Sequence, residues 1–200
     1  GAIMAREDLE AIAEVLKGTD ILVLSDEIYS ELTYGDKPHV SIASLSGMRE
    51  RTLLVSGFSK AYAMTGWRLG YLAAPGAMIH EIFKIHQYGI MCAPTTAQFG
   101  AIEAMQNGDG DVEEMVAEYD RRRKYLVHKL RDLGLPCFEP KGAFYVFPNI
   151  SGFGMTSEQF CEKLLYDYGV AIVVAEYENG TATFTLSYDV DFELVGLYMK

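Results

Sequence analysis

The sequence predicts an α/β sheet domain followed by a smaller α+β domain. Over residues 1–106, short apolar runs of strand length alternate with longer segments of helical pattern, which is typical of an α/β sheet. The polar, glycine-rich stretch Asn107–Asp111 then interrupts this alternation. We therefore predict two domains, residues 1–107 and residues 108–200.

Alternating helices and strands are expected in the first domain. A helix opens it, because Leu9, Ile12, Ala13 and Leu16 follow the i, i+3, i+4, i+7 spacing of one helix face. The continuous apolar run Ile21–Leu24 indicates a strand of a parallel sheet that is covered on both faces. Further strands are predicted at 51–56 and 69–74, and further helices at 76–90 and 94–106.

The second domain is expected to begin with a long amphipathic helix over residues 111–133. Its basic run Arg121–Lys124 is interpreted as a solvated face. The remaining predicted elements are a strand at 142–147, a helix at 156–168 and strands at 170–174 and 183–188.

Composition excludes several classes of partner. Half of the 200 residues are hydrophobic, which is enough for a sizeable core, and the formal net charge of −11 argues against nucleic acid and anionic membranes. No apolar run approaches the roughly 18 residues of a membrane helix. Cys92, Cys137 and Cys161 are odd in number and lack the spacing of metal ligands, so we expect no metal site and a reduced, cytoplasmic setting.

The stretch Ser56–Gly70 carries the strongest chemical signal. It places Lys60 between a predicted strand and a glycine-containing turn, and Arg68 follows eight residues later. Upstream, an apolar strand ends on Asp26, and Tyr29 follows. Each residue alone has an ordinary structural interpretation, such as a helix cap for Asp26. Together they supply a lysine for covalent capture of a carbonyl and a cation for a phosphate, as an enzyme built around pyridoxal 5′-phosphate (PLP) needs.

These motifs together resemble the fold type I PLP-dependent aminotransferases of class I/II. The resemblance rests on Asp-x-x-Tyr at a strand end, Ser-Lys, and Met-Thr-Gly-Trp-Arg-x-Gly-Tyr. It implies that residues 1–107 are the C-terminal part of the large PLP-binding domain. Residues 108–200 would be the small C-terminal domain, truncated or divergent after about residue 174. The chain would then be the C-terminal half of such an enzyme.

The resemblance also implies a role for each site residue. Lys60 would be the catalytic residue, carrying PLP as a Schiff base and moving a proton at the substrate Cα. Asp26 would keep the pyridine nitrogen protonated, and Tyr29 would donate to the ring's phenolic oxygen. Arg68 and Ser59 would bind the phosphate. The substrates would be an amino acid and a 2-oxo acid.

Further segments match the family. Residues 86–98 resemble its segment that lines the partner subunit's active site, which implies a homodimer. Lys141–Tyr145 resembles its small-domain strand near the substrate. Gly1–Ala2 resembles the end of its Asn-Pro-Thr-Gly motif.

The chain also departs from the family pattern. Gly57 stands where the phosphate site often has a serine, which leaves Ser59 as the candidate. Thr185 stands where the last strand usually has an arginine for the substrate carboxylate, and threonine cannot form that bidentate ion pair. Gly66 and Gly70 are expected to let the backbone turn and approach closely.

Two alternatives to an aminotransferase stay open at this point. One is a PLP-dependent carbon–sulfur lyase on the same fold, which would use the same lysine for elimination. The other is a non-catalytic fragment, or a module of a transcription regulator that uses this fold. The motifs do not identify the amino acid substrate.

Overall fold

The computed structural model describes residues 1–169, 171–177, 180–188 and 194–198, with side chains up to residue 169. The chain forms two compact units. Unit 1 comprises Gly1–Lys129 and Phe138–Val146, and unit 2 comprises Leu130–Cys137 and Phe147–Lys200. The chain therefore leaves unit 1 and returns to it for a short segment that, as shown below, completes the candidate site.

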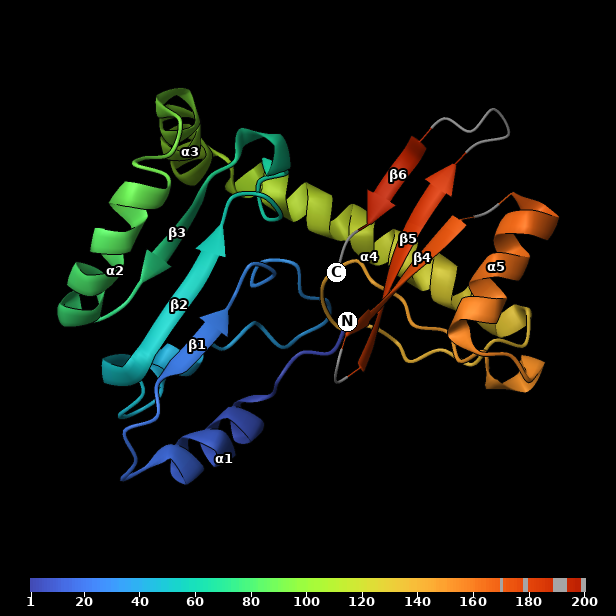
Figure 1. Cartoon of the computed structure of the whole chain (residues 1–200), viewed down its shortest axis with the longest axis horizontal. Coiled ribbons are helices and arrows are strands. Elements are labelled where there is room, and N and C mark those ends of the chain that lie inside the picture. The colour runs from blue at the N-terminus through green and yellow to red at the C-terminus, as the bar shows by residue number, and fades with distance from the viewer. Residues whose placement is uncertain (170, 178–179, 189–193, 199–200) are drawn as a thin grey trace. The chain divides into compact units, whose positions relative to one another are not determined.

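A three-stranded sheet forms the centre of unit 1 (Figure 1). Its strands are β1 (Val23–Asp26), β2 (Thr52–Gly57) and β3 (Gly70–Ala73), in that spatial order. β1 runs parallel to β2, and β3 runs antiparallel to β2. All three predicted strands are confirmed, but the sheet is mixed rather than parallel throughout.

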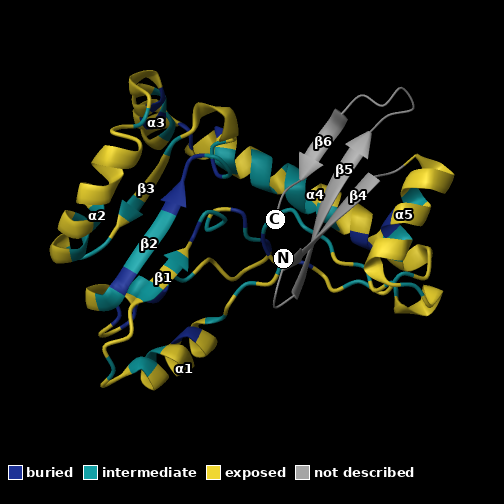
Figure 2. Ribbon diagram, in the orientation of Figure 1, coloured by how far each residue is buried: buried dark blue, intermediate teal, exposed yellow. Residues whose placement is uncertain are grey.

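The prediction that other elements cover both faces of β1 is wrong for the part of the chain that the structure describes. The side chains of Leu22 and Leu24 are 57% and 70% exposed. The central strand β2 is better protected and carries buried residues at both ends (Figure 2). Unit 1 therefore leaves apolar surface of its sheet open on the β1 side.

The helices of unit 1 follow the apolar periodicity of the sequence, so the predicted helices are confirmed. They are α1 (Arg6–Leu16), α2 (Gly76–Gly89), α3 (Thr95–Asn107) and α4 (Asp109–Asp132), whose last residues enter unit 2. Short 3₁₀ helices lie at Ile42–Ser44, Arg49–Arg51 and Thr65–Trp67. No helix in the described ranges combines the length and apolarity that a membrane crossing requires.

Two buried apolar clusters hold unit 1 together. In the first, Leu9 of α1 packs with Ile42, Leu45 and Met48. In the second, Phe58 and Met64 pack with Ala101 of α3, next to the predicted lysine site. Burying a side chain of this size contributes about 1.5–3 kcal/mol, so the second cluster anchors the turn that carries Lys60.

Unit 2 contains the 3₁₀ helix Ser151–Phe153, helix α5 (Ser157–Tyr168) and an antiparallel sheet in the order β4-β5-β6. The strands are β4 (Ala171–Tyr177), β5 (Gly180–Tyr188) and β6 (Leu194–Tyr198). Thr156 caps α5: its hydroxyl oxygen accepts from Gln159 N at 3.2 Å, and the side-chain oxygen of Gln159 accepts from Thr156 N at 3.0 Å. The predicted helix and the two predicted strands are confirmed, whereas β6 had no counterpart in the prediction.

The strand predicted at 142–147 does not form. Only one bridge, Thr33↔Gly142, pairs residues 142–146 with another segment of unit 1. The reason lies at Ala143, whose φ of +55° turns the backbone out of the extended conformation. The segment is held as a bent loop instead.

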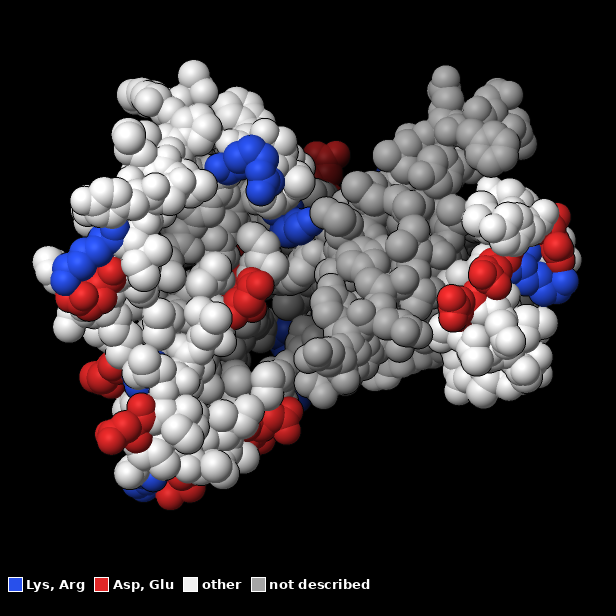
Figure 3. Space-filling model, viewed as in Figure 1, with Lys and Arg blue, Asp and Glu red and all other residues white. Residues whose placement is uncertain are grey.

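The basic run in α4 is only partly a solvated face. Arg121, Arg122 and Lys124 are 64–71% exposed and pair with Glu118 or Asp120 on the same helix. Arg123 is only 11% exposed, which contradicts the prediction for this residue. Elsewhere on unit 1, acidic and basic side chains are interspersed on the face seen in Figure 3.

The predicted domain boundary between residues 107 and 108 falls in the short connection between α3 and α4. The two compact units divide later, inside α4 after Lys129. Compactness within one chain does not by itself define the domains of a fold, so the division into a large and a small domain stays a prediction.

Candidate active site

Strand direction gathers the predicted site residues at one edge of the unit 1 sheet. Asp26 is the last residue of β1, and Lys60 comes three residues after the end of β2. Because these two strands are parallel, their carboxyl ends meet at the same edge. Arg68 precedes the start of antiparallel β3, where Gly70 pairs with Gly57, and therefore lies at that edge as well.

The amine of Lys60 lies over two aromatic rings. Its Nζ is 5.8 Å from the ring centroid of Tyr29 and 5.4 Å from that of Phe144. Both distances fall within the range in which a cation is attracted to the face of a ring. The side chain is half-buried, so the amine has a fixed environment.

The hydroxyl of Tyr29 forms a hydrogen bond with the hydroxyl of Tyr145, with 2.5 Å between the two oxygens. The ring of Tyr29 also meets Phe144 and Tyr145 edge to face, at centroid distances of 5.4 Å and 5.7 Å. Burial raises the pKa of Tyr29 well above its ordinary value. Tyr29 therefore keeps its proton at neutral pH and can act as a donor.

Asp26 is exposed at the end of β1, and one of its oxygens shapes the turn that follows. Oδ1 accepts a hydrogen bond from the backbone N–H of Ile28 at 3.1 Å. This side-chain-to-backbone bond closes a turn rather than capping a helix. Among the described residues, Oδ2 accepts no hydrogen bond, so one carboxylate oxygen remains for a ligand.

The turn over residues 59–68 is closed by two hydrogen bonds that involve Thr65. Its hydroxyl donates to the carbonyl of Ser59 at 2.8 Å, and its own carbonyl accepts from Nη1 of Arg68 at 2.8 Å. Arg68 is exposed and has a φ of +55°. The backbone reversal thus uses positive φ at Ala63 and Arg68, whereas Gly66, expected to make the turn, has no positive φ and has open space around it.

Close backbone approach requires glycine at the junction of β2 and β3. A Cβ on Gly57 would lie 2.9 Å from the Cα of Gly70, and a Cβ on Gly70 would lie 3.0 Å from the carbonyl oxygen of Ser56. Neither contact is possible for a larger residue without a backbone shift. The expected role of Gly70 is confirmed, and the serine-to-glycine departure at Gly57 has a steric cause.

Phe144 and Tyr145 reach the site because the bent loop Phe138–Val146 is tied to residues 32–34. The N–H of Ala143 donates to the carbonyl of Leu32 at 2.8 Å, and the Tyr34 hydroxyl donates to the carbonyl of Ala143 at 2.5 Å. These bonds hold the left-handed conformation of Ala143. Strained backbone of this kind persists only where its surroundings fix it, often at functional sites.

Arg123 joins the same loop to α4. Its guanidinium donates to the carbonyl of Pro140 at 2.8 Å and to Glu139 at 3.0 Å, and it lies 5.1 Å from the ring centroid of Tyr34. The fork geometry of arginine allows these contacts at once. Arg123 therefore supports the segment that carries Phe144 and Tyr145.

A buried polar network beside Asp26 was not predicted. Glu27 is 7% exposed and bonds with His39 at 2.8 Å, Ser41 at 2.6 Å and Ser25 at 3.1 Å. The Ser56 hydroxyl donates to the Glu27 carbonyl at 3.2 Å. No local sequence signal marks this network, because its members come from separate segments.

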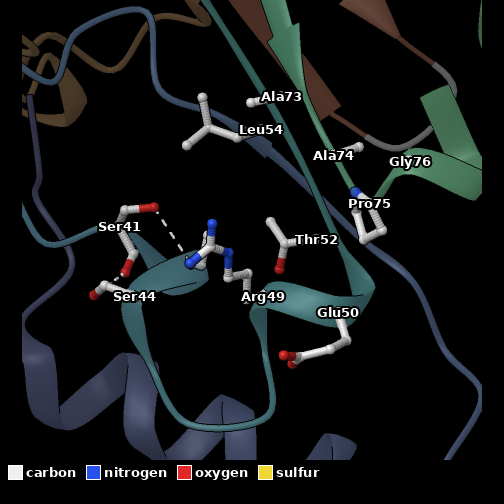
Figure 4. A pocket seen from close by; sticks show the side chains of 11 residues that line it. Ser41, Ser44, Arg49, Glu50, Thr52, Leu54, Ala73, Ala74, Pro75 and Gly76 are labelled. Carbon is white, nitrogen blue, oxygen red and sulfur yellow. Dashed lines mark hydrogen bonds between the residues drawn. The ribbon is translucent and has the colours of Figure 1, made fainter.

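A hollow of about 650 Å³ lies at the opposite end of the sheet (Figure 4). It is lined by residues near the start of β2 and the end of β3, among them Thr52, Leu54 and Ala73, together with Arg49. Since Lys60 follows the other end of β2, this hollow is separate from the candidate site.

Thr185 lies on β5, where its backbone pairs with Ile172 and Tyr198. Its side chain lies outside the described residues, so its predicted inability to bind a carboxylate stays a prediction. The other predicted residues, Asp26, Tyr29, Ser59, Lys60 and Arg68, all lie in unit 1.

A family model described as aminotransferase class I and II matches residues 1–190. The chain belongs to this family. The structure agrees with the fold expected of fold type I aminotransferases, and family membership makes PLP the expected cofactor.

Individual aminotransferases resemble the chain over most of its length. It is 54% identical over 173 residues to YugH of Bacillus subtilis (strain 168), a protein that is named as an aminotransferase. It is 47% identical over 175 residues to an aspartate aminotransferase of Pyrococcus abyssi (strain GE5 / Orsay). Each match covers 86% of this chain and 45% of the relative.

A solved structure shows the same similarity. The aromatic aminotransferase from Pyrococcus horikoshii OT3 superposes with a TM-score of 0.82 at 47% identity, over 86% of this chain and 47% of that one. The chain thus spans about half the length of the relatives it matches.

The residues at the sheet edge fit PLP. Lys60 supplies an amine, Asp26 a carboxylate oxygen without a hydrogen bond in the described structure, Tyr29 a protonated phenol, and Arg68 an exposed guanidinium. These four groups would complement, in the same order, the aldehyde, the pyridine nitrogen, the phenolic oxygen and the phosphate of PLP.

Proposed function

We propose that the protein containing this chain is a PLP-dependent aminotransferase that moves an amino group between an amino acid and a 2-oxo acid. The position of Lys60 carries the proposal. Its amine lies over Tyr29 and Phe144 at the sheet edge that also holds Asp26 and Arg68. Membership of an aminotransferase family supports the reaction class.

PLP, when bound, supplies an electron sink for the bond that breaks at the substrate Cα. Lys60 would hold the cofactor and then, as a free amine, take up and return the Cα proton. Asp26 would hold a proton on the ring nitrogen through its Oδ2. Tyr29 would donate to the ring oxygen, and Arg68 with Ser59 would bind the phosphate.

The substrate class stays at the level of amino acid and 2-oxo acid. The similar proteins reported above include one named for aspartate and one named for aromatic substrates. Equal identity to the two, 47% in each case, therefore does not select between these substrates. Neither comparison favours the carbon–sulfur lyase alternative.

We propose further that the protein is a cytoplasmic homodimer. The segment 86–98, which resembles the family's cross-subunit segment, exposes large apolar side chains. Tyr88 is 89% exposed, Ile90 70% and Met91 75%. Several large apolar side chains exposed within one short segment mark a protein contact more often than bare solvent.

Covalent trapping tests the proposed function. Borohydride reduction of the complete protein with PLP, followed by peptide mapping, should place the label on Lys60. A Lys60→Arg variant keeps the charge and should carry no label. A label on another lysine would contradict the assignment.

Half-reaction spectroscopy tests the reaction class. Addition of an amino acid substrate should convert the bound cofactor to pyridoxamine phosphate, because transamination leaves the amino group on the cofactor. Formation of a 2-oxo acid and ammonia without that conversion would favour elimination instead.

A further inference from the structure

The Tyr29–Tyr145 pair joins two residues that lie 116 positions apart in the sequence. Their oxygens are 2.5 Å apart, and either hydroxyl could be the donor. A phenol has one proton to donate and two lone pairs that accept. The direction of this bond therefore depends on which other hydrogen bonds each phenol makes.

Proton counting fixes the direction once PLP is bound. Tyr29 keeps its single proton at neutral pH, since burial raises its pKa. If that proton is donated to the ring oxygen, it is no longer available to Tyr145. The short O–O contact then persists only if Tyr145 is the donor and Tyr29 the acceptor.

We propose that Tyr145 is a positioning residue that donates its phenolic proton to the oxygen of Tyr29, which leaves the Tyr29 proton for the ring oxygen of PLP. This inference rests on the proposed function. It assigns to the loop Phe138–Val146 a part in the proton arrangement of the site.

The loop is built to hold Tyr145 in place. Ala143 is fixed in its left-handed conformation by Leu32 and Tyr34, and Phe144 packs edge to face on Tyr29. The ring of Tyr119 on α4 stacks on the ring of Phe144, with 5.4 Å between the two ring centroids. Tyr145 thus meets Tyr29 from a constrained backbone.

A consequence for pH follows from hydrogen-bond cooperativity. A phenol that accepts a hydrogen bond becomes a stronger donor. The ring oxygen of PLP would accept hydrogen bonds both from Tyr29 and from the protonated nitrogen that joins Lys60 to PLP. A stronger bond from Tyr29 weakens the bond from that nitrogen, so the nitrogen would lose its proton at a lower pH. The charged and titratable groups beside Tyr29 are Lys60, Asp26, Tyr119 and Tyr145.

The visible absorption band of the PLP-loaded, complete protein reports this pH directly. Tyr145→Phe should raise the midpoint of its pH titration by roughly 0.3–1 unit, the size expected when one hydrogen bond is lost beside the reporting group. Tyr145→Leu should shift it in the same direction. Tyr125→Phe, which removes an exposed phenol on α4 away from the site, should leave the midpoint unchanged.

A double-mutant comparison separates action through Tyr29 from a general disturbance. In a Tyr29→Phe background, Tyr145→Phe should cause no further shift, because the acceptor is already gone. An unchanged midpoint in Tyr145→Phe, or an equal shift in both backgrounds, would overturn the inference alone. Absence of any absorption band that depends on Lys60 would overturn the proposed function and this inference with it.

Discussion

Glu27 and His39 face each other across 2.8 Å between Oε2 and Nε2, and Glu27 is almost fully buried. Ser41 and Ser25 bond to the other carboxylate oxygen. The network fixes the residue next to Asp26 and joins the loop around His39 to the end of β1. The carboxylate of Asp26 is thus supported by its neighbour in the chain.

Truncation of Glu27 should therefore destabilise the fold. Glu27→Ala leaves the partly exposed His39 and two half-buried hydroxyls without their carboxylate partner, at a cost of about 1–3 kcal/mol. Chemical denaturation of the variant should show this loss. Glu31→Ala, an exposed acid four residues on, should change the free energy of unfolding by less than about 0.5 kcal/mol. Equal effects in the two variants would contradict a structural role for the network.

Asp26 should matter more to chemistry than to folding. Asp26→Asn keeps an oxygen that can accept from Ile28 N but removes the negative charge that would hold a proton on the ring nitrogen of PLP. The half-reaction rate should fall by orders of magnitude, each tenfold being about 1.4 kcal/mol of barrier. The melting temperature should change little.

Asp26→Ala provides the matching comparison, since it removes both the charge and the turn bond. It should lose the same activity and also some stability. Near-normal turnover in Asp26→Asn would show that the carboxylate serves only the turn.

The carboxyl of Glu118 should titrate far below an ordinary glutamate. Hydrogen bonds from Arg121 and Arg122 lower its pKa to about 2. Its contribution to stability is complete above the pKa of the unfolded chain, near 4.5, and is lost as the pH falls towards 2. The contribution is small because the pair is exposed. An NMR titration should find the midpoint near 2, and Arg121→Gln should raise it.

Residues 1–200 expressed alone should not transaminate. The chain spans about half the length of its relatives, and Leu22 and Leu24 leave apolar surface open beside the edge strand β1. We expect weak PLP absorbance and poor solubility. Assays of this chain beside the complete protein check the expectation, and turnover of any amino acid by the 200 residues would overturn it.

Much of unit 1 could be predicted from local pattern and strand direction. Apolar periodicity located α1, and continuous apolar runs located the strands. The rule for parallel strands placed Asp26 and Lys60 at one edge. The apolar run at 142–147 predicted a strand, but Ala143 adopts a positive φ because its hydrogen bonds go to Leu32 and Tyr34.

Long-range partners could not be predicted. Arg123 sits in a basic run that suggests solvent, yet Tyr34 and the 138–146 loop cover it. The Tyr29–Tyr145 bond and the contact of Glu27 with His39 join segments whose spacing carries no signal. Such pairs depend on tertiary packing rather than on any local preference.

The separation of Tyr29 from Tyr145 also has a consequence for biosynthesis. Contacts of high sequence separation form late, because the intervening chain must first be ordered. A ribosome would have to release the polypeptide well past residue 145 before the phenol pair could close. Until then, the amine of Lys60 would lie beside Tyr29 but not beside Phe144. The second of these two rings would reach Lys60 only after synthesis of the whole of α4.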